Sequence, residues 1–478
     1  MRARLLAEEN RKWWTLAAVS FGLFMIMLDN TVVNVALPAM QRHLHLQSSE
    51  LEWIVVGYAL TFATLMLTGG KLADLYGRRL LFVVGLVIFT AASLACGLAP
   101  NAGFLIAARC IQGSGAAIMN PATLGIIAAT FPPRQRGTAI GIWAGTSAMA
   151  LAIGPLVGGV ITQHLNWSWI FFINVPIGVV AVFVAFWAID ESRDTSHEQR
   201  LDLPGLVSSG IGLFALTYAL IESNTYGWTS ARILALFAAA AVALIAFVVL
   251  ERRQRLPMLD VALFRNRTFS GANVAMLLTA LAMFGIFFFN SLFFQTIIGW
   301  SATQTGAMFL PMTLLIVALA PQTGRLSDRV GSRWLVGGGM TLLCGSLILF
   351  AQVGVGADFW NVLPALVLGG VGMAMTMTPT TAAVMSSVPT DKAGVGSAVL
   401  NSARQVGGSL GIAVMGAVVA SHLSAQRGSP AFAGEFVSGY HAALYVAAGV
   451  AITGALVAIV TLRHVGHARA GAVAAEIG

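Results

Sequence analysis

Long apolar stretches, separated by short polar segments, run along almost the whole chain. A helix of about 20 apolar residues is long enough to cross the hydrocarbon core of a bilayer. Such stretches predict an all-α integral membrane protein with fourteen transmembrane helices, at 14–37, 51–70, 81–99, 104–130, 138–162, 170–189, 204–222, 231–250, 270–294, 304–322, 334–353, 360–378, 396–420 and 441–462. An even number of spans places both termini on the same side of the membrane.

Lysine and arginine residues indicate which side that is, because cytoplasmic loops carry an excess of them. Only three of the 27, Arg42, Arg232 and Arg427, fall in the opposite loops or span ends, and two, Arg109 and Arg404, lie within spans. All the others lie on the side of the N-terminus. We therefore expect a multi-pass protein of the cytoplasmic (inner) membrane with both termini in the cytoplasm. The same asymmetry explains the net charge of +8 as topology, so no nucleic-acid partner is expected.

Composition supports a membrane protein, since 57% of the residues are hydrophobic and only 10% are charged. The first apolar run is longer than the core of a signal peptide and lacks a good cleavage site, so it is predicted to be the first span. The three cysteines all lie in apolar runs, where small core residues are expected rather than disulfides. No cluster of His or Cys has the spacing of metal ligands.

An internal repeat divides the chain. GKLADLYGRR at 70–79 and GRLSDRVGSR at 324–333 share one pattern, and each follows a predicted span on the cytoplasmic side, eight spans apart. This spacing predicts two bundles of six helices with two extra helices between them. The predicted organisation is 1–13 cytoplasmic N-terminus, 14–189 first bundle, 190–269 linkers with two inserted helices, 270–462 second bundle and 463–478 cytoplasmic tail. Parallel repeats of this kind are typical of transporters whose substrate site lies between the halves.

Ionisable residues deep in the predicted spans are few. Asp29 lies about halfway along the first span, and Arg109 lies at a similar depth in the fourth. A charge at the bilayer centre costs at least about 2.5–3.5 kcal/mol, so such residues are functional hypotheses by default. Asp29 and Arg109 could face one another or share a water-filled cavity in which Asp29 takes up and releases a proton, or they could only fix a contact between helices. Arg404, in the thirteenth span, could bind carbonyl groups at a helix interface or line the cavity.

Several segments carry a family pattern: LDNTVVNVALP from Leu28, the loop GKLADLYGRR, RCIQGSGAAIMNP from Arg109, and GPLVGG from Gly154. With these segments the chain resembles the major facilitator superfamily, and within it the fourteen-span drug:proton antiporters of the EmrB/QacA type. The resemblance covers residues 14 to 462. It implies the major facilitator fold, with a central cavity that opens alternately to each side. It also implies that an inward proton gradient drives the substrate out.

The resemblance also assigns roles to residues of this chain. It implies proton coupling at Asp29 and Arg109. It implies that Asp74 receives a helix dipole and the two following arginines, and so latches the halves in one state. The full loop motif comprises Gly70, Asp74, Gly77, Arg78 and Arg79, with Gly324, Asp328 and Arg329 in the second copy. The motif of the fifth helix, which implies export, comprises Gly141, Gly154, Pro155, Gly158 and Gly159, with Ala150 where the family has a further glycine.

Polar and aromatic residues within spans are candidates for the substrate cavity: Asn34, Gln112, Asn120, Phe288, Asn290, Asn401 and Gln405. The aromatic stretch at 282–294 could equally face lipid or pack between helices. No second acid is apparent in the core of the second half. We therefore expect that a proton and a cationic substrate share Asp29, which favours monovalent cationic or neutral lipophilic substrates.

Three functions fit this sequence. The first is proton-coupled multidrug efflux and antibiotic resistance. The second is dedicated export of one metabolite or self-made antibiotic, and the third is a non-transporting membrane receptor with the same fold. We expect no enzyme, because no nucleophile–base pair, metal-ligand set or Walker-type segment is present. The expected partners are protons, the bilayer and a small lipophilic substrate, with no cofactor beyond the proton gradient. A monomer is expected, with an accessory protein as an open option.

Overall fold

The computed structural model describes residues 8–193, 202–254, 259, 261–388, 393–424 and 430–462. Fourteen helices in this part of the chain are long and apolar enough to cross a membrane, which confirms the predicted number. Their elements are α2 (Glu8–Leu44), α3 (Ser48–Tyr76), α4 (Arg78–Gly97), α5 (Ala102–Thr130), α6 (Pro133–His164), α7 (Trp169–Phe172) with α8 (Asn174–Ala188), α9 (Leu203–Tyr226), α10 (Ala231–Arg253), α11 (Arg267–Leu292), α12 (Ala302–Met308) with α13 (Leu310–Val330), α14 (Ser332–Phe350), α15 (Phe359–Ser387), α16 (Ala393–Ser421) and α17 (Pro430–Thr461).

Many helices are longer than the apolar runs that predict them. The first span was expected at 14–37, whereas α2 extends from Glu8 to Leu44. Hydropathy reports only the part of a helix that contacts hydrocarbon, and the helical hydrogen bonds continue into the polar interface. After α11, a π-helical turn, η2 (Phe293–Ile298), lengthens the ninth span beyond its apolar run.

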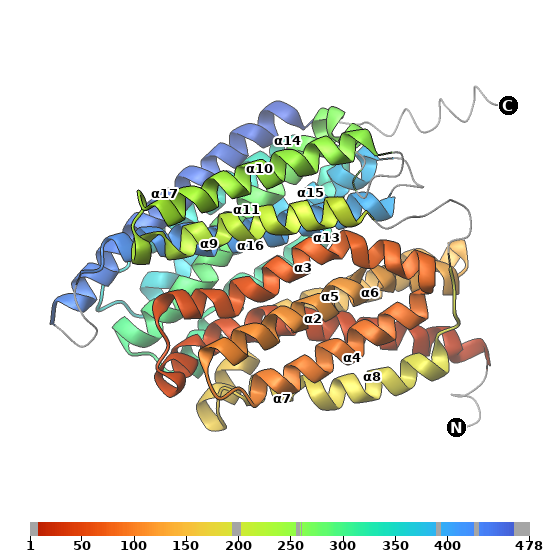
Figure 1. Cartoon of the computed structure of the whole chain (residues 1–478), viewed down its shortest axis with the longest axis horizontal. Helices are drawn as coiled ribbons and strands as arrows, with labels where there is room; N and C mark the ends of the chain where they lie inside the picture. Colours follow the sequence, from red (N-terminus) through yellow and green to blue (C-terminus); the bar gives the residue numbers. More distant parts are fainter. Residues whose placement is uncertain are drawn as a thin grey trace.

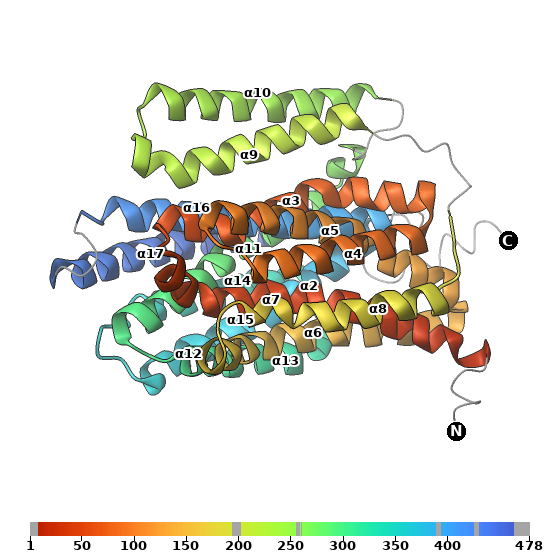
Figure 2. The ribbon, with the colours of Figure 1, turned by 60° about the horizontal axis from the view of Figure 1, so that its bottom comes forward.

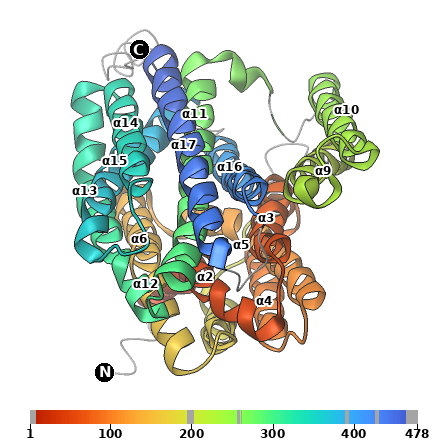
Figure 3. The same ribbon diagram turned by 90° about the vertical axis from the view of Figure 1, so that its left-hand side faces the viewer.

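The transmembrane helices form two bundles, α2–α8 and α11–α17, that lie side by side with their axes roughly parallel (Figures 1 and 3). One contact is repeated in both bundles. Gly85 of α4 meets Gly115 of α5, and Gly339 of α14 meets Gly372 of α15, so closely that an added Cβ would lie 2.7–2.8 Å from the partner's carbonyl oxygen. Glycines allow helix backbones to approach at this distance. The equivalent glycine pairs show that the internal repeat extends from the loops into the packing.

The inserted helices α9 and α10 pack against each other outside the two bundles (Figure 2). α9 contacts α3 of the first bundle and α16 of the second. At its outer end Asn224 donates to the carbonyl oxygen of Ala417, at 2.8 Å. At its opposite end, Asp202 accepts a hydrogen bond from the backbone N–H of Gly205 at 2.7 Å and caps the helix. The insert therefore lies across the seam between the halves.

Candidate functional site

Asp29 and Arg109 form a buried ion pair between α2 and α5. Nη1 of Arg109 lies 2.5 Å from Oδ2 of Asp29, and both side chains are at most 1% exposed. The Nε of Arg109 also donates to the carbonyl oxygen of Ile54, at 3.0 Å. A buried pair is stable only if its geometry is good and its remaining hydrogen-bonding groups are satisfied. The pairing that equal depth in the sequence suggested is present in this conformation.

A polar network surrounds this pair. Gln112, one helical turn after Arg109, donates to Oδ1 of Asp29 at 2.9 Å and accepts from Nη1 of Arg109 at 2.6 Å. It also contacts Ser93 of α4 at 2.6 Å, and Ser93 accepts from Asn174 of α8 at 3.2 Å. Four helices of the first bundle thus fix the carboxylate. Ser93 and Asn174 were not predicted, because isolated polar residues in apolar runs give no spacing signal.

A second feature, the central cavity, lies between the two bundles at mid-membrane depth and has a volume of about 120 Å³. Met27, Asn30, Thr31 and Asn34 of α2 line one side. Aromatic and methionine side chains face them from the second bundle: Met283, Phe284, Phe287, Met373 and Met377. Sites for drug-sized molecules span about 300–1,000 Å³. The cavity must therefore widen to accept such a molecule.

Helix α2 separates the ion pair from the central cavity. The cavity-lining positions 27, 30, 31 and 34 form one helical face, and Asp29 points roughly 150° away from that face at 3.6 residues per turn. Asp29 is fully buried and does not line the cavity. In this conformation a cationic substrate in the central cavity would not contact the Asp29 carboxylate, so the cavity geometry does not support a site shared by substrate and proton.

The predicted cavity residues divide into several groups. Asn34 and Gln405 line the central cavity, while Gln112 belongs to the ion-pair network. Asn120 and Asn401 instead line a separate space nearer the cytoplasm. The other two candidates lie outside the cavity lining. Asn290 accepts from the hydroxyl of Tyr440 at 2.5 Å. Phe288 is buried against Phe289, because it follows the cavity-lining Phe287 by roughly 100° around the helix.

Glu52 of α3, at the start of the predicted span 51–70, is a further buried acid. It is 6% exposed, and one carboxylate oxygen has no hydrogen-bond partner among the described residues. The carboxylate fills the space beside Gly416 of α16, where a Cβ would overlap it. Glu222 of α9 interacts with it as a like charge. Its burial escaped prediction because α3 begins at Ser48 and the second bundle and the insert cover its first turns.

The loop motif after α3 is held within the first bundle. Arg78 pairs with Asp74 at 3.0 Å, one helical turn away, and Gly77 has a φ of 123°, a conformation that side chains disfavour. Arg79 bonds the carbonyl oxygen of Ile189 rather than Asp74. The described contacts of this motif stay within the first bundle in this conformation. The latch that the resemblance implies for one state stays a prediction. In the second copy, Gly324 and Arg329 lie at the end of α13, and the Asp328 side chain is outside the described part.

Glu191 caps the N-terminus of α4. Its carboxylate oxygens accept from the backbone N–H groups of Arg79 at 3.1 Å and Leu80 at 3.2 Å. An acidic group here satisfies unpaired donors and complements the helix dipole. No sequence signal indicated this residue, because it lies more than 110 positions from the helix it caps.

Glu191→Ala is expected to lower the free energy of unfolding by about 1 kcal/mol, the usual effect of losing a helix cap. Thermal unfolding of the purified protein in detergent measures the change. Asp190→Ala is the matched control, because the neighbouring Asp190 forms only an exposed ion pair with Arg11, worth about 0–1 kcal/mol. Equal effects of the two substitutions would contradict the capping role.

The outer ends of the two bundles are in close contact. Gly159 of α6 packs on Ala302, and Gly306 of α12 packs on Pro155, each so closely that a Cβ would overlap backbone atoms.

Within the first bundle, Gly154 and Gly158 of α6 pack against Thr31 and Val32 of α2. Ala150, where a further glycine was expected, is fully buried. Gly141 has open space around it and takes no part in this seam. The glycines of the fifth-helix motif thus bring α6 against α2 and α12.

At the end of the bundles that carries the loop motif, a cavity of about 260 Å³ extends from Lys71, Asp74 and Asn120 of the first bundle to Ser397 and Asn401 of the second. At the opposite end, Gln295 donates to the carbonyl oxygen of Val35 at 2.8 Å across the seam. The two bundles are therefore in contact at the end away from the loop motif and enclose a space at the end that carries it.

Gly306→Val is expected to destabilise this outward-closed state, because overpacking costs about 1–3 kcal/mol. The population ratio should shift by roughly 5–150-fold, the factor that corresponds to 1–3 kcal/mol. Labelling of Thr313→Cys by a membrane-impermeant thiol reagent, in a background lacking the native cysteines, should become correspondingly faster. Gly434→Val, where open space surrounds the glycine, is the control. An unchanged labelling rate would show that the seam does not limit opening.

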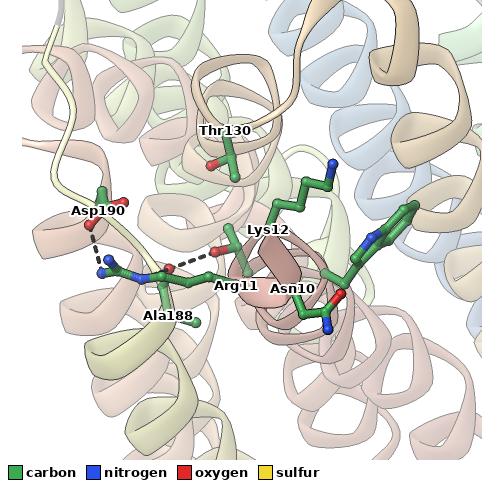
Figure 4. Close-up of a pocket in the computed structure, with 8 residues that line it drawn as sticks. Asn10, Arg11, Lys12, Thr130, Ala188 and Asp190 are labelled. Carbon is green, nitrogen blue, oxygen red and sulfur yellow. Dashed lines mark hydrogen bonds and ion pairs between the residues drawn. The ribbon is translucent and has the colours of Figure 1, made fainter. Parts of the chain in front are cut away.

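Another cavity, of about 660 Å³, lies at the N-terminal end of α2 (Figure 4). There Arg11 pairs with Asp190 at 2.6 Å, and Arg11 and Thr15 both donate to the carbonyl oxygen of Ala188. All its lining residues belong to the first bundle and its cytoplasmic ends. Because it does not lie between the bundles, it is not part of the alternating pathway.

Comparisons with known proteins agree with this architecture. A family model described as Major Facilitator Superfamily matches residues 19–412. The chain is 37% identical over 418 residues to the "Tetracenomycin C resistance and export protein" of Streptomyces glaucescens, covering 86% of this chain and 77% of that one. It is 36% identical over 414 residues to "Multidrug resistance protein Stp" of Mycobacterium tuberculosis, covering 86% and 76%. The inward-facing, unoccupied structure of a bacterial homolog of the human lysosomal transporter Spinster shares the fold, with a TM-score of 0.69, 15% identity and coverage of 95% and 97%.

Proposed function

The chain belongs to the Major Facilitator Superfamily, and we propose that it is a proton-coupled exporter of lipophilic drugs or antibiotics in the cytoplasmic membrane. Its relatives are named for drug and antibiotic resistance or export, which supports efflux as the activity. The transport is non-enzymatic, and its energy comes from the proton gradient without a cofactor. We further propose a monomer with both termini in the cytoplasm.

The Asp29–Arg109 pair carries the proposal of proton coupling. In this inward-facing conformation the carboxylate accepts hydrogen bonds from Arg109 and Gln112. Protonation removes the charge that holds the guanidinium. A proton from outside therefore binds once the pair separates in the outward-facing state. When the pair re-forms in the inward-facing state, the proton leaves to the cytoplasm.

Helix α2 links this proton step to substrate. One face of the helix carries Asp29, and the opposite face contributes Asn30, Thr31 and Asn34 to the central cavity. A movement of α2 that separates the ion pair therefore changes the cavity wall at the same time. The outer part of the same helix packs on Gly154 and Gly158 of α6, next to the outer seam. Protonation, substrate binding and opening thus act on one structural element.

A second candidate is a dedicated exporter of one antibiotic. The relative from Streptomyces glaucescens is named for a single compound, which favours this alternative. Both candidates predict the same proton coupling. They differ in substrate range, so transport of a panel of unrelated lipophilic compounds separates them.

The test uses the purified protein in liposomes that have a pH gradient and contain a fluorescent pH indicator. Addition of a transported compound is expected to dissipate the gradient, because protons move against the substrate. Protein-free liposomes are the control for passive leakage of lipophilic compounds. If no compound in a broad panel dissipates the gradient while uptake of radiolabelled compound proceeds, transport is not coupled to protons.

A further inference from the structure

Arg404 of α16 lies in the wall of the central cavity, which resolves the alternative that the sequence left open. Among the described residues that line this cavity it is the sole charged side chain, and no Asp or Glu accompanies it. The other polar groups are amides and hydroxyls, on Asn30, Thr31, Asn34, Thr313 and Gln405. The cavity that receives the substrate is therefore positively charged.

The guanidinium of Arg404 forms no ion pair with any described residue. Its side chain is partly buried, its Nε is buried without a hydrogen bond, and the phenol of Tyr58 lies within electrostatic range of it. A charge held away from water is costly unless it is paired. The Asp29 carboxylate of the first bundle is already occupied by Arg109 and Gln112. An unpaired cation at this depth indicates that a ligand supplies the partner.

A second unsatisfied donor lies beside it. Gln405 is 2% exposed, lines the same cavity, and its Nε2 has no hydrogen-bond partner among the described residues. Two adjacent donors without acceptors match a carboxylate or phenolate, whose oxygens accept and do not donate. The lining also holds one unpartnered acceptor, Oδ1 of Asn34, which could accept from an N–H or O–H of the bound molecule. A cationic amine would still meet the like charge of Arg404.

The rest of the cavity fits an apolar body. Phe284 and Phe287 of α11 and Met373 and Met377 of α15 line it, together with Met27 of α2. Methionines adapt to ligands of different shape, and aromatic rings provide large apolar contacts. A molecule held here would combine one anionic group with an apolar ring system.

We propose that the central cavity binds amphipathic organic anions, whose carboxylate or phenolate accepts hydrogen bonds from Arg404 and Gln405. This inference rests on the proposed function, since it names the substrate class of the same cavity. It has an electrical consequence. Export of a monoanion against one entering proton moves two positive charges inward, whereas export of a monocation against one proton moves none. Transport of an acid is therefore driven by an inside-negative membrane potential.

The test compares three matched fluorescent probes: dansylglycine, its amide, and the cationic dansylcadaverine. Binding to the full chain in lipid nanodiscs at pH 7 needs no proton gradient, so it is measured separately from transport. The acid is expected to bind at least about tenfold more tightly than the amide, and the cation most weakly. A tenfold difference corresponds to about 1.4 kcal/mol.

Three variants test whether Arg404 causes the preference for the acid. Arg404→Gln should reduce the affinity for the acid to that for the amide and leave the amide within about twofold, while Arg404→Lys should retain part of the preference. Arg333→Gln, an exposed arginine at the start of α14, should change neither affinity. Because Arg404→Gln removes a partly buried charge that has no ion-pair partner among the described residues, its ligand-free melting temperature should not fall, so a loss of binding cannot be ascribed to misfolding.

The proposal is overturned if folded wild-type protein binds the cation as tightly as the acid. It is also overturned if the wild type binds none of the three probes, or if Arg404→Gln leaves binding of the acid unchanged. A failure of the proposed function looks different. In that case the acid would bind with the expected preference, but its transport in liposomes would not respond to a pH gradient.

Discussion

Asp29→Asn is expected to reduce transport driven by a pH gradient to the level of protein-free liposomes. Asparagine has nearly the same shape and still offers an oxygen to Arg109, but it cannot bind and release a proton in this pH range. The substitution should therefore remove coupling while keeping the central cavity, since Asp29 does not line it. Uptake of a radiolabelled compound into liposomes, with and without a pH gradient, measures the effect.

Exchange of labelled for unlabelled compound in the absence of a gradient is the companion measurement. It requires the alternating movement but no net proton transfer, so it should persist in Asp29→Asn. Asp190→Asn is the matched control, because this aspartate is exposed at the cytoplasmic surface and pairs only with Arg11. Full gradient-driven uptake by Asp29→Asn would refute the proton site. Loss of both activities would instead identify a structural role.

Arg109→Leu is expected to have the largest effect on stability. It leaves the Asp29 carboxylate buried without its cationic partner, which costs about 3–5 kcal/mol. The substitution also removes the hydrogen bond from Nε of Arg109 to the carbonyl oxygen of Ile54. It further removes the cation–π contact between the guanidinium and the Tyr58 ring, whose centroid lies 4.3 Å from Cζ. The free energy of unfolding in mixed detergent micelles, or the melting temperature, measures the loss.

The double variant Asp29→Asn/Arg109→Leu tests whether the two residues act as a pair. Removal of both charges leaves no buried unpaired ion, so the double variant should be more stable than Arg109→Leu alone. Residues in direct contact typically show interaction energies of about 0.5–3 kcal/mol. If the effects of the two single substitutions simply add, the ion pair contributes no coupling and Arg109 stabilises the fold by other contacts.

The number of spans and the bundle architecture could be predicted because the membrane imposes strong local rules. Backbone groups in hydrocarbon must bond within their own helix, so each crossing leaves an apolar run in the sequence. The repeated loop pattern marked the equivalent positions, and glycine pairs such as Gly85–Gly115 and Gly339–Gly372 repeat in the structure as well. Helix ends were less predictable, because α2 and its neighbours extend past the apolar region.

The functional residues were only partly predictable. A lone carboxylate and a lone arginine at equal depth suggested a pair, because few other arrangements make two such charges tolerable. The carboxylate of Glu191 caps the N-terminus of α4, which no local pattern predicted, because the two lie far apart in the sequence. Phe288 and Asn290 were selected for their chemistry, yet the rotation of α11 directs Phe284 and Phe287 to the cavity.

The sequence by itself determined the number of spans, the two repeated halves and the deep position of Asp29, since each of these follows from local hydropathy or a short motif. The tertiary structure decided which face of each helix meets which partner. It placed Asp29 behind the cavity wall, paired with Arg109, and it left Arg404 facing the cavity without a counter-ion. Helix rotation sets these contacts, and rotation depends on the packing of residues distant in the chain. For that reason the charge of the substrate cavity emerged only from the folded molecule.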